Sequence, residues 1–219
     1  MEVMDVLFSI FELLGTVAFA VSGAMEGVRH RMDLFGVTLL GLVTAIGGGV
    51  LRDLVIGQIP PKVFRDSRCA VLAILVALAV FIILKLTQER KPRALAHLRD
   101  RLYFLSDTIG LAAFTVLGIE SAGPGRNTGL LLFVGMITGV GGGVLRDILA
   151  GSVPSILRKH IYAVASLAGA LADVLLMHIL PAEIAMLAGF GLVVLIRLAA
   201  AHYKWNLPHI DLDEDDAED

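Results

Sequence analysis

Long apolar runs separated by short polar segments make up most of the chain. Seven of them have, or approach, the roughly 20 residues with which a helix crosses about 30 Å of hydrocarbon. The run from Cys69 to Leu84 contains no charged residue. The pattern therefore predicts an all-α polytopic membrane protein with seven transmembrane helices. We place these at about Leu7–Gly27, Leu34–Gly57, Cys69–Leu86, Leu102–Glu120, Gly129–Gly151, Ile161–Leu180 and Glu183–His202.

An internal duplication runs through most of this pattern. The segment TAIGGGVLRDLVIGQIP, from Thr44 to Pro60, recurs as TGVGGGVLRDILAGSVP from Thr138 to Pro154, with ten of the seventeen residues identical. The match continues upstream, where five further residues recur 95 positions later. These are Gly15, Ala18, Phe19, Val21 and Gly23, which correspond to Gly110, Ala113, Phe114, Val116 and Gly118.

Each copy covers three spans, at about residues 5–86 and 102–180. Because three is an odd number, the second copy enters the membrane from the opposite side, and we expect two inverted three-helix repeats. The seventh helix, at about residues 183–202, has no counterpart. We expect a single transmembrane domain over residues 1–203, followed by an acidic cytosolic tail over residues 204–219.

Lysine and arginine in the loops predict the orientation. With the N-terminus outside, eleven of these residues fall on the inner side and four on the outer side. Positively charged loops tend to stay in the cytoplasm, so we expect the N-terminus outside and the C-terminus inside. The tail from Asp211 to Asp219 carries seven acidic residues, which is typical of a disordered, solvated segment.

The composition agrees with a membrane protein and argues against an enzyme. Of 219 residues, 57% are hydrophobic, and the mean hydropathy of +0.81 is well above that of an ordinary soluble domain. The single cysteine, Cys69, excludes an internal disulfide. The sequence has no zinc-ligand spacing, Walker lysine loop or GxSxG segment. We expect no catalysed reaction, no cofactor and no nucleic-acid partner.

Three consecutive glycines occur in the second span and again in the fifth. Small residues let membrane helices pack closely, but each glycine also costs a helix about 1 kcal/mol relative to alanine. We favour a bent or broken helix, because the triplet is duplicated and followed by charges. A break would free carbonyls near Gly47 and Gly141 for a transient monovalent cation. The candidate positions are Thr44, Gly47, Gly48, Gly49, Thr138, Gly141, Gly142 and Gly143.

An Arg-Asp pair follows each triple glycine, as Arg52-Asp53 and Arg146-Asp147. A charge at the bilayer centre costs about 2.5–3.5 kcal/mol on insertion scales, so these side chains should be paired inside the bundle. Arg52 would meet Asp147 across the pseudo-twofold axis. By the same symmetry Arg146 would meet Asp53, unless each arginine pairs with its neighbour in sequence. The pairs serve either as structural links between the repeats or as part of a pathway.

Other polar residues within the spans carry weaker signals. Glu12 and Asp107 lie near predicted span ends, where water reaches them. Asp173 is deeper, and a hydrogen bond between helices explains it better than a metal site. The hydroxyl of Ser22 is a candidate for lining a pathway, whereas Arg197 is expected to extend to the inner interface.

The doubled GGGVLRD in two three-span repeats, with a seventh span added, resembles the bacterial branch of the trimeric intracellular cation (TRIC) channel family. The resemblance covers about residues 5–203. It implies a homotrimer in the bacterial inner membrane, surrounded by lipid, with a cation pathway inside each protomer. It also implies conduction of K⁺ first and Na⁺ second. The same domain is also labelled a glycine transporter, so a small-molecule transporter remains the alternative. The positions that inherit the pore assignment are Gly47, Gly48, Gly49, Arg52, Asp53, Gly141, Gly142, Gly143, Arg146 and Asp147.

Overall fold

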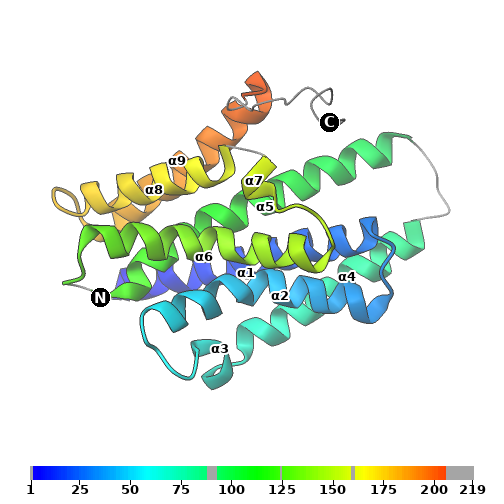
Figure 1. Cartoon of the computed structure of the whole chain (residues 1–219), viewed down its shortest axis with the longest axis horizontal. Helices are drawn as coiled ribbons and strands as arrows, with labels where there is room; N and C mark the ends of the chain where they lie inside the picture. The colour runs from blue at the N-terminus through cyan, green and yellow to red at the C-terminus, as the bar shows by residue number, and fades with distance from the viewer. Residues whose placement is uncertain (1, 88–92, 124, 159–160, 206–219) are drawn as a thin grey trace, which may run out of the picture.

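The computed structural model describes residues 2–87, 93–123, 125–158 and 161–205, and these residues are almost entirely helical. The predictions for the tail beyond residue 205 lie outside the described residues. The helices follow one another along an antiparallel bundle (Figure 1). Within the described ranges they are α1 Glu2–Arg29, α2 Leu34–Val55, α3 Lys62–Arg65, α4 Arg68–Thr87, α5 Arg93–Ala122, α6 Thr128–Leu149, α7 Ser155–Arg158, α8 Ile161–Leu176 and α9 Ala182–Tyr203.

The predicted seven spans are confirmed as helices. Six are long and apolar enough to cross a membrane, and α8 is a shorter apolar helix of 16 residues. The protein is therefore a multi-pass integral membrane protein. The main difference is α5, which begins at Arg93 rather than near Leu102, because a polar helical extension gives no hydropathy signal. The short helices α3 and α7 were not predicted either.

Equivalent residues begin the two glycine-bearing helices. The carboxylate of Asp33 accepts the backbone N–H of Gly36 at 2.8 Å at the start of α2. The amide oxygen of Asn127 accepts the N–H of Leu130 at 2.7 Å at the start of α6. Asp and Asn are favoured at this position because they satisfy backbone donors that the helix itself leaves unpaired. The duplication therefore extends to the helix caps.

The helix contacts repeat in the same way as the sequence. In the first repeat α1 packs against α2 and α4, and in the second α5 packs against α6 and α8. The repeats join through equivalent helices, α1 against α5 and α2 against α6. Figure 1 shows α2 and α6 running in opposite directions. Two inverted three-helix repeats are thus confirmed, and α9 packs beside α8 and α5.

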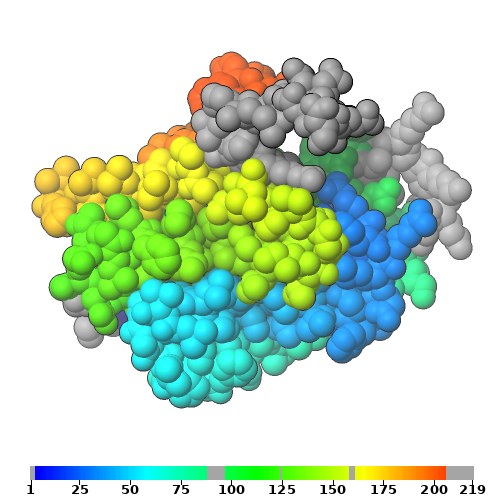
Figure 2. Space-filling model, in the orientation of Figure 1, coloured from blue at the N-terminus to red at the C-terminus, as the bar shows by residue number. Residues whose placement is uncertain are grey.

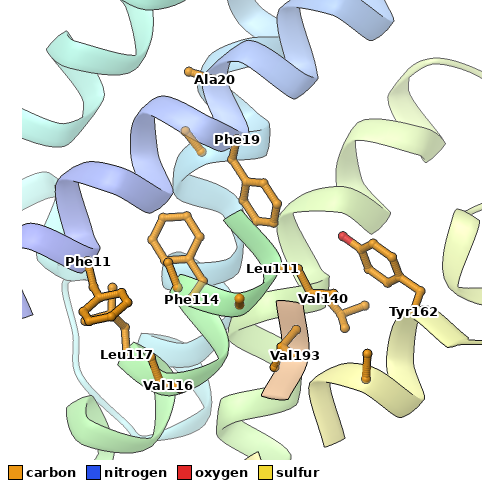
Figure 3. Close-up of a cluster of buried hydrophobic side chains, with 14 of the residues drawn as sticks. Phe11, Phe19, Ala20, Leu111, Phe114, Val116, Leu117, Val140, Tyr162 and Val193 are labelled. Atoms are coloured by element: carbon orange, nitrogen blue, oxygen red, sulfur yellow. The ribbon is translucent and has the colours of Figure 1, made fainter. Parts of the chain in front are cut away.

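One face of the molecule shows how closely these helices join. In Figure 2 the chain of α6 and α7 lies between α8 on one side and α2 with α3 on the other. The interior behind this face is apolar, and Phe19 from α1 and Phe114 from α5 lie at its centre, with ring centroids 5.3 Å apart (Figure 3). This packed centre separates the two ends of the bundle, where the charged groups are found.

Candidate functional site

The triple glycines lie where α2 crosses α6. A methyl group at Gly48 would overlap the carbonyl oxygen of Thr138, and one at Gly142 would overlap the carbonyl oxygen of Thr44. The two threonine hydroxyls donate within their own helices, to Leu40 O and Val134 O, at 2.6 Å each. The middle glycine of each triplet therefore allows backbone-to-backbone contact between the repeats, which the small-residue interpretation predicts.

Neither helix is interrupted at its glycines. The α-helices α2 and α6 continue through Gly47–Gly49 and Gly141–Gly143, so an interruption of either helix is excluded, whereas a bend at the glycines stays a prediction. Close packing compensates the poor helix propensity of glycine, which is why the helix persists. Because carbonyls inside a continuous helix accept intrahelical hydrogen bonds, the cation site expected near Gly47 and Gly141 loses the break on which it depended.

The Arg-Asp pairs are local. Arg52 donates from Nε and Nη2 to Oδ1 of Asp53, both at 2.8 Å. Arg146 donates from Nε to Oδ1 of Asp147, also at 2.8 Å. All four residues are at most 8% exposed. The crossed pairing of Arg52 with Asp147 and of Arg146 with Asp53 is wrong, and the alternative of neighbouring partners is confirmed. Adjacent residues near a helix end can turn their side chains together without bridging two helices.

Each aspartate also holds the short helix that follows it. The second oxygen of Asp53 accepts the N–H of Lys62, the first residue of α3, at 2.7 Å. The second oxygen of Asp147 accepts the N–H of Ser155, the first residue of α7, at 2.6 Å. A carboxylate is well placed there because the first N–H groups of a helix lack intrahelical partners. The duplicated motif therefore positions the connecting segment at each end of the bundle.

A buried network surrounds the second pair at the α7 end. Oδ1 of Asp107 accepts Nη1 of Arg146 at 2.6 Å, and the same Nη1 donates to Ser22 Oγ at 2.5 Å. The other oxygen of Asp107 accepts Nη2 of Arg197 at 3.1 Å, and the hydroxyl of Tyr162 lies 3.4 Å from Oδ1. We call these residues, with Asp147, the Asp107 network.

Two sequence-based expectations fail in this network. Asp107 is 3% exposed and Arg197 is 7% exposed, so neither lies within reach of water at a span end or interface. Arg197 instead extends inward from α9, with its guanidinium carbon 4.8 Å from the Tyr162 ring centroid and 5.0 Å from that of Phe104. Arg197 points inward rather than toward the interface because an ion pair with a carboxylate satisfies both charges inside the bundle.

A small cavity adjoins the first pair at the α3 end. Its volume is about 50 Å³, and its lining includes Gly49, Arg52, Asp53 and Phe114 together with Cys69. Two further lining residues form an ion pair, because Nζ of Lys62 lies 2.6 Å from Oε1 of Glu12. These two side chains are 39% and 29% exposed. We call this space the α3 cavity; unlike the Asp107 network, it admits solvent.

A larger cavity lies at the other end, near the Asp107 network. It measures about 320 Å³, and Arg29, Arg31, Arg99, Asp100 and Tyr103 are among its lining residues. The Tyr103 ring lies 5.2 Å from the guanidinium carbon of Arg29 and 5.3 Å from that of Arg146 in the network. Tyr103 therefore connects this arginine-lined cavity to the buried charges.

Some of these residues left a signal in the sequence. Glu12 and Asp107 are 95 positions apart, the same offset that relates Gly15 to Gly110. That correspondence would have predicted an equivalent acidic residue near each Arg-Asp pair. Arg197 had no such signal, because α9 has no repeat counterpart. Asp173 is fully buried, and its carboxylate oxygens have no hydrogen-bond partner among the described residues, so the hydrogen bond between helices that we expected for it is wrong.

The chain resembles known membrane proteins over nearly its whole length. A family model described as "Glycine transporter" matches residues 9–85 and again residues 104–178. The UPF0126 inner membrane protein YadS of Escherichia coli K12 is 36% identical over 206 residues, covering 93% of this chain and 96% of that protein. A UPF0126 membrane protein of Deinococcus radiodurans is 41% identical over 201 residues, covering 89% and 87%.

Solved structures share the fold. One from work on the structural basis for conductance through TRIC cation channels is 35% identical, with a TM-score of 0.81, covering 94% of this chain and 98% of that one. The TRIC trimeric intracellular cation channel orthologue from Rhodobacter sphaeroides is 34% identical, with a TM-score of 0.80, covering 90% and 98%. A prokaryotic TRIC channel in 0.5 M KCl is 26% identical, with a TM-score of 0.82.

Proposed function

The chain belongs to the UPF0126, or glycine-transporter, family of membrane proteins, and from this premise we propose that it is a passive channel for monovalent cations, with K⁺ preferred over Na⁺. The likeness to TRIC cation channels supports this function. The main structural support for the channel function is that each end of the bundle has a charged site, and that each site contains one copy of the same Arg-Asp motif.

The proposed pathway runs along α1 and α5 between these ends. On α1, Thr16 lines the α3 cavity and Met25 lines the arginine-lined cavity; on α5, Phe114 and Tyr103 do the same. The crossing of α2 and α6 lies beside this line. The pathway positions are Thr44, Gly47, Gly48, Gly49, Arg52, Asp53, Thr138, Gly141, Gly142, Gly143, Arg146 and Asp147.

The centre of this pathway is closed in the present conformation. Phe19 is fully buried and packs against Phe114 between the two ends. Dense apolar packing has no room for a hydrated ion, so conduction requires these rings to move apart. Since α1 and α5 meet directly, a separation of the two repeats would shift both rings together.

The assembly and location follow the same relatives. We propose a homotrimer in a bacterial cytoplasmic membrane, with the α3 cavity outside, the arginine-lined cavity inside, and lipid around the exposed apolar faces. Cys69, the single cysteine, lines the α3 cavity and reports this orientation. A membrane-impermeant maleimide should label it from the outer side of intact cells. Labelling only after the cells are opened would reverse the proposed orientation.

The alternative, transport of glycine, has one observation in its favour. Arg52, Lys62, Glu12 and Asp53 place both signs of charge around the α3 cavity, as a zwitterion requires. However, small-molecule sites usually occupy about 300–1,000 Å³, and this cavity measures about 50 Å³. The present geometry suits a single ion or a few waters better than an amino acid.

The test uses purified protein in liposomes. K⁺ efflux is followed with a potassium-sensitive dye and uptake of labelled glycine is measured in parallel, with empty liposomes as the control. The proposal predicts K⁺ flux that rises linearly with concentration without saturating. Saturable glycine uptake with counterflow and no ionic current would replace the channel with a transporter.

A further inference from the structure

Each end of the proposed pathway contains two cations and two carboxylates. The α3 end has Arg52 and Asp53 together with the ion pair of Lys62 and Glu12. The α7 end contains, in the Asp107 network, two arginines and two aspartates. Its members are Arg146, Arg197, Asp147 and Asp107. Both groups are neutral when every side chain is ionised, although they differ widely in burial.

Three members of each group are related by the repeat, and the fourth is not. Glu12 corresponds to Asp107 at an offset of 95, and each Arg-Asp pair corresponds to the other at 94. Lys62 has no charged equivalent, because Ile156 occupies the position 94 residues later and Ser155 is the residue that begins α7. The second repeat instead receives its fourth charge, Arg197, from α9. The two ends therefore reach the same charge balance with cations from unrelated parts of the chain.

We propose that Glu12 and Asp107 are the cation-binding carboxylates of the pathway, and that Lys62 and Arg197 are tethered counter-ions which a permeating cation displaces. This inference rests on the proposed channel function. It moves the ion sites from the glycine carbonyls to carboxylates at the two ends.

The hydrogen bonds distinguish the displaceable cations from the fixed ones. Arg52 holds Asp53 through two nitrogens, and Arg146 has Asp147, Ser22 and Asp107 as partners. Lys62 reaches Glu12 through a single, partly exposed ammonium group.

Arg197 is similarly weakly held. It makes one hydrogen bond to Asp107, at 3.1 Å, and its buried Nε has no partner among the described residues. Its aromatic neighbours, Tyr162 and Phe104, supply cation–π contacts rather than hydrogen bonds. A guanidinium with an unsatisfied buried donor is poorly retained, so Arg197 is the network member that moves most readily away from Asp107.

The charge balance fixes the sign of each substitution. Lys62→Gln or Arg197→Gln removes the competing cation, leaves a net negative site and should raise K⁺ conductance. Glu12→Gln or Asp107→Asn leaves a net positive site and should lower it. A unit charge about 4 Å from an ion, acting through water, corresponds to about a fivefold change, and we expect at least this for each variant.

The experiment measures single-channel K⁺ conductance and the reversal potential in a KCl gradient for wild type and the four variants. Arg65→Gln on α3 and Lys204→Gln after α9 are matched controls, since both remove one exposed positive charge outside the groups. The lysine and arginine variants should shift the reversal potential toward that of K⁺, and the two acid variants toward that of Cl⁻. A purely structural role would alter protein yield without moving the reversal potential.

Cys69 provides a test that does not depend on folding of a variant. It lines the same cavity as Glu12, so a positively charged methanethiosulfonate should lower K⁺ conductance and a negatively charged one should raise it. The inference would be overturned if wild type conducts K⁺ but all four variants keep its reversal potential. It would also be overturned if the two reagents at Cys69 have equal effects. Absence of K⁺ conduction by wild type would instead reject the channel function itself.

Discussion

Alanine substitutions within one triple glycine should have opposite effects, because the three positions face different surroundings. At Gly48 an added methyl group overlaps the carbonyl oxygen of Thr138 on α6. At Gly49 the nearest atom to such a methyl group is Nη2 of Arg52, 3.8 Å away, which is an ordinary van der Waals contact. Gly48→Ala therefore forces two backbones apart, whereas Gly49→Ala occupies available space.

The magnitudes follow from two competing terms. Alanine favours a helix over glycine by about 1 kcal/mol at either position. Overpacking typically costs about 1–3 kcal/mol, and the cost at Gly48 lies toward the upper end because the obstacle is backbone rather than a flexible side chain. We expect Gly48→Ala to lose about 1–2 kcal/mol and Gly49→Ala to gain up to about 1 kcal/mol. For a chain of this size, a gap of about 2–3 kcal/mol corresponds to roughly 4–12 °C in Tm.

The assay is thermal unfolding in detergent, followed by the amount of protein that remains monodisperse after heating. Gly142→Ala should behave like Gly48→Ala, since it meets the Thr44 carbonyl in the second repeat. Gly191→Ala, with no atom within 4 Å of the added carbon, is the matched control. Equal Tm values for Gly48→Ala and Gly49→Ala would refute the packing account of the triplet and restore a conformational role for all three glycines.

Two further predictions concern single hydrogen bonds and a surface ion pair. Ser22→Ala removes an acceptor from the buried Arg146 guanidinium and should cost about 1.5–3 kcal/mol; Ser9→Ala, whose bond is exposed, should be nearly neutral on the same thermal assay. The Arg68 guanidinium lowers the pKa of Asp66 from 3.8 to about 2, so this pair stabilises the fold above about pH 4, and its contribution is lost as the pH falls through 2. Arg68→Gln should return the pKa toward 3.8 in a ¹³C carboxyl titration; an unchanged pKa would assign the shift to another group.

The sequence pattern predicted the spans well because membrane insertion imposes length and hydropathy directly. The predicted helix at Leu34–Gly57 corresponds to α2 at Leu34–Val55. Boundaries failed where helices leave the membrane, since the polar residues before Leu102 continue α5 in water without an apolar signal. The inverted repeat was also predictable from the sequence, because each copy of the duplicated unit has an odd number of spans and the second must enter the membrane from the opposite side.

The candidate site was only partly predictable. Burial of the Arg-Asp pairs follows from the cost of charge in a membrane, but their partners depend on side-chain directions that spacing alone does not reveal. We predicted that Gly48 would weaken its helix, but the structure shows that it allows α6 to pack closely against α2. This close packing stabilises a helix that glycine alone would weaken. The inward position of Arg197 could not be predicted from the sequence, since its partner Asp107 is 90 residues away and α9 lies outside the repeat.

The central claim is that this fold conducts cations, and the most direct measurement is the reversal potential of the purified wild-type protein in planar bilayers with a KCl gradient. The account predicts a current that reverses close to the Nernst potential of K⁺, with a smaller shift when Na⁺ replaces K⁺ on one side than when an impermeant organic cation does. A current that reverses at the Cl⁻ potential would contradict the account, as would the absence of current from protein that takes up glycine saturably.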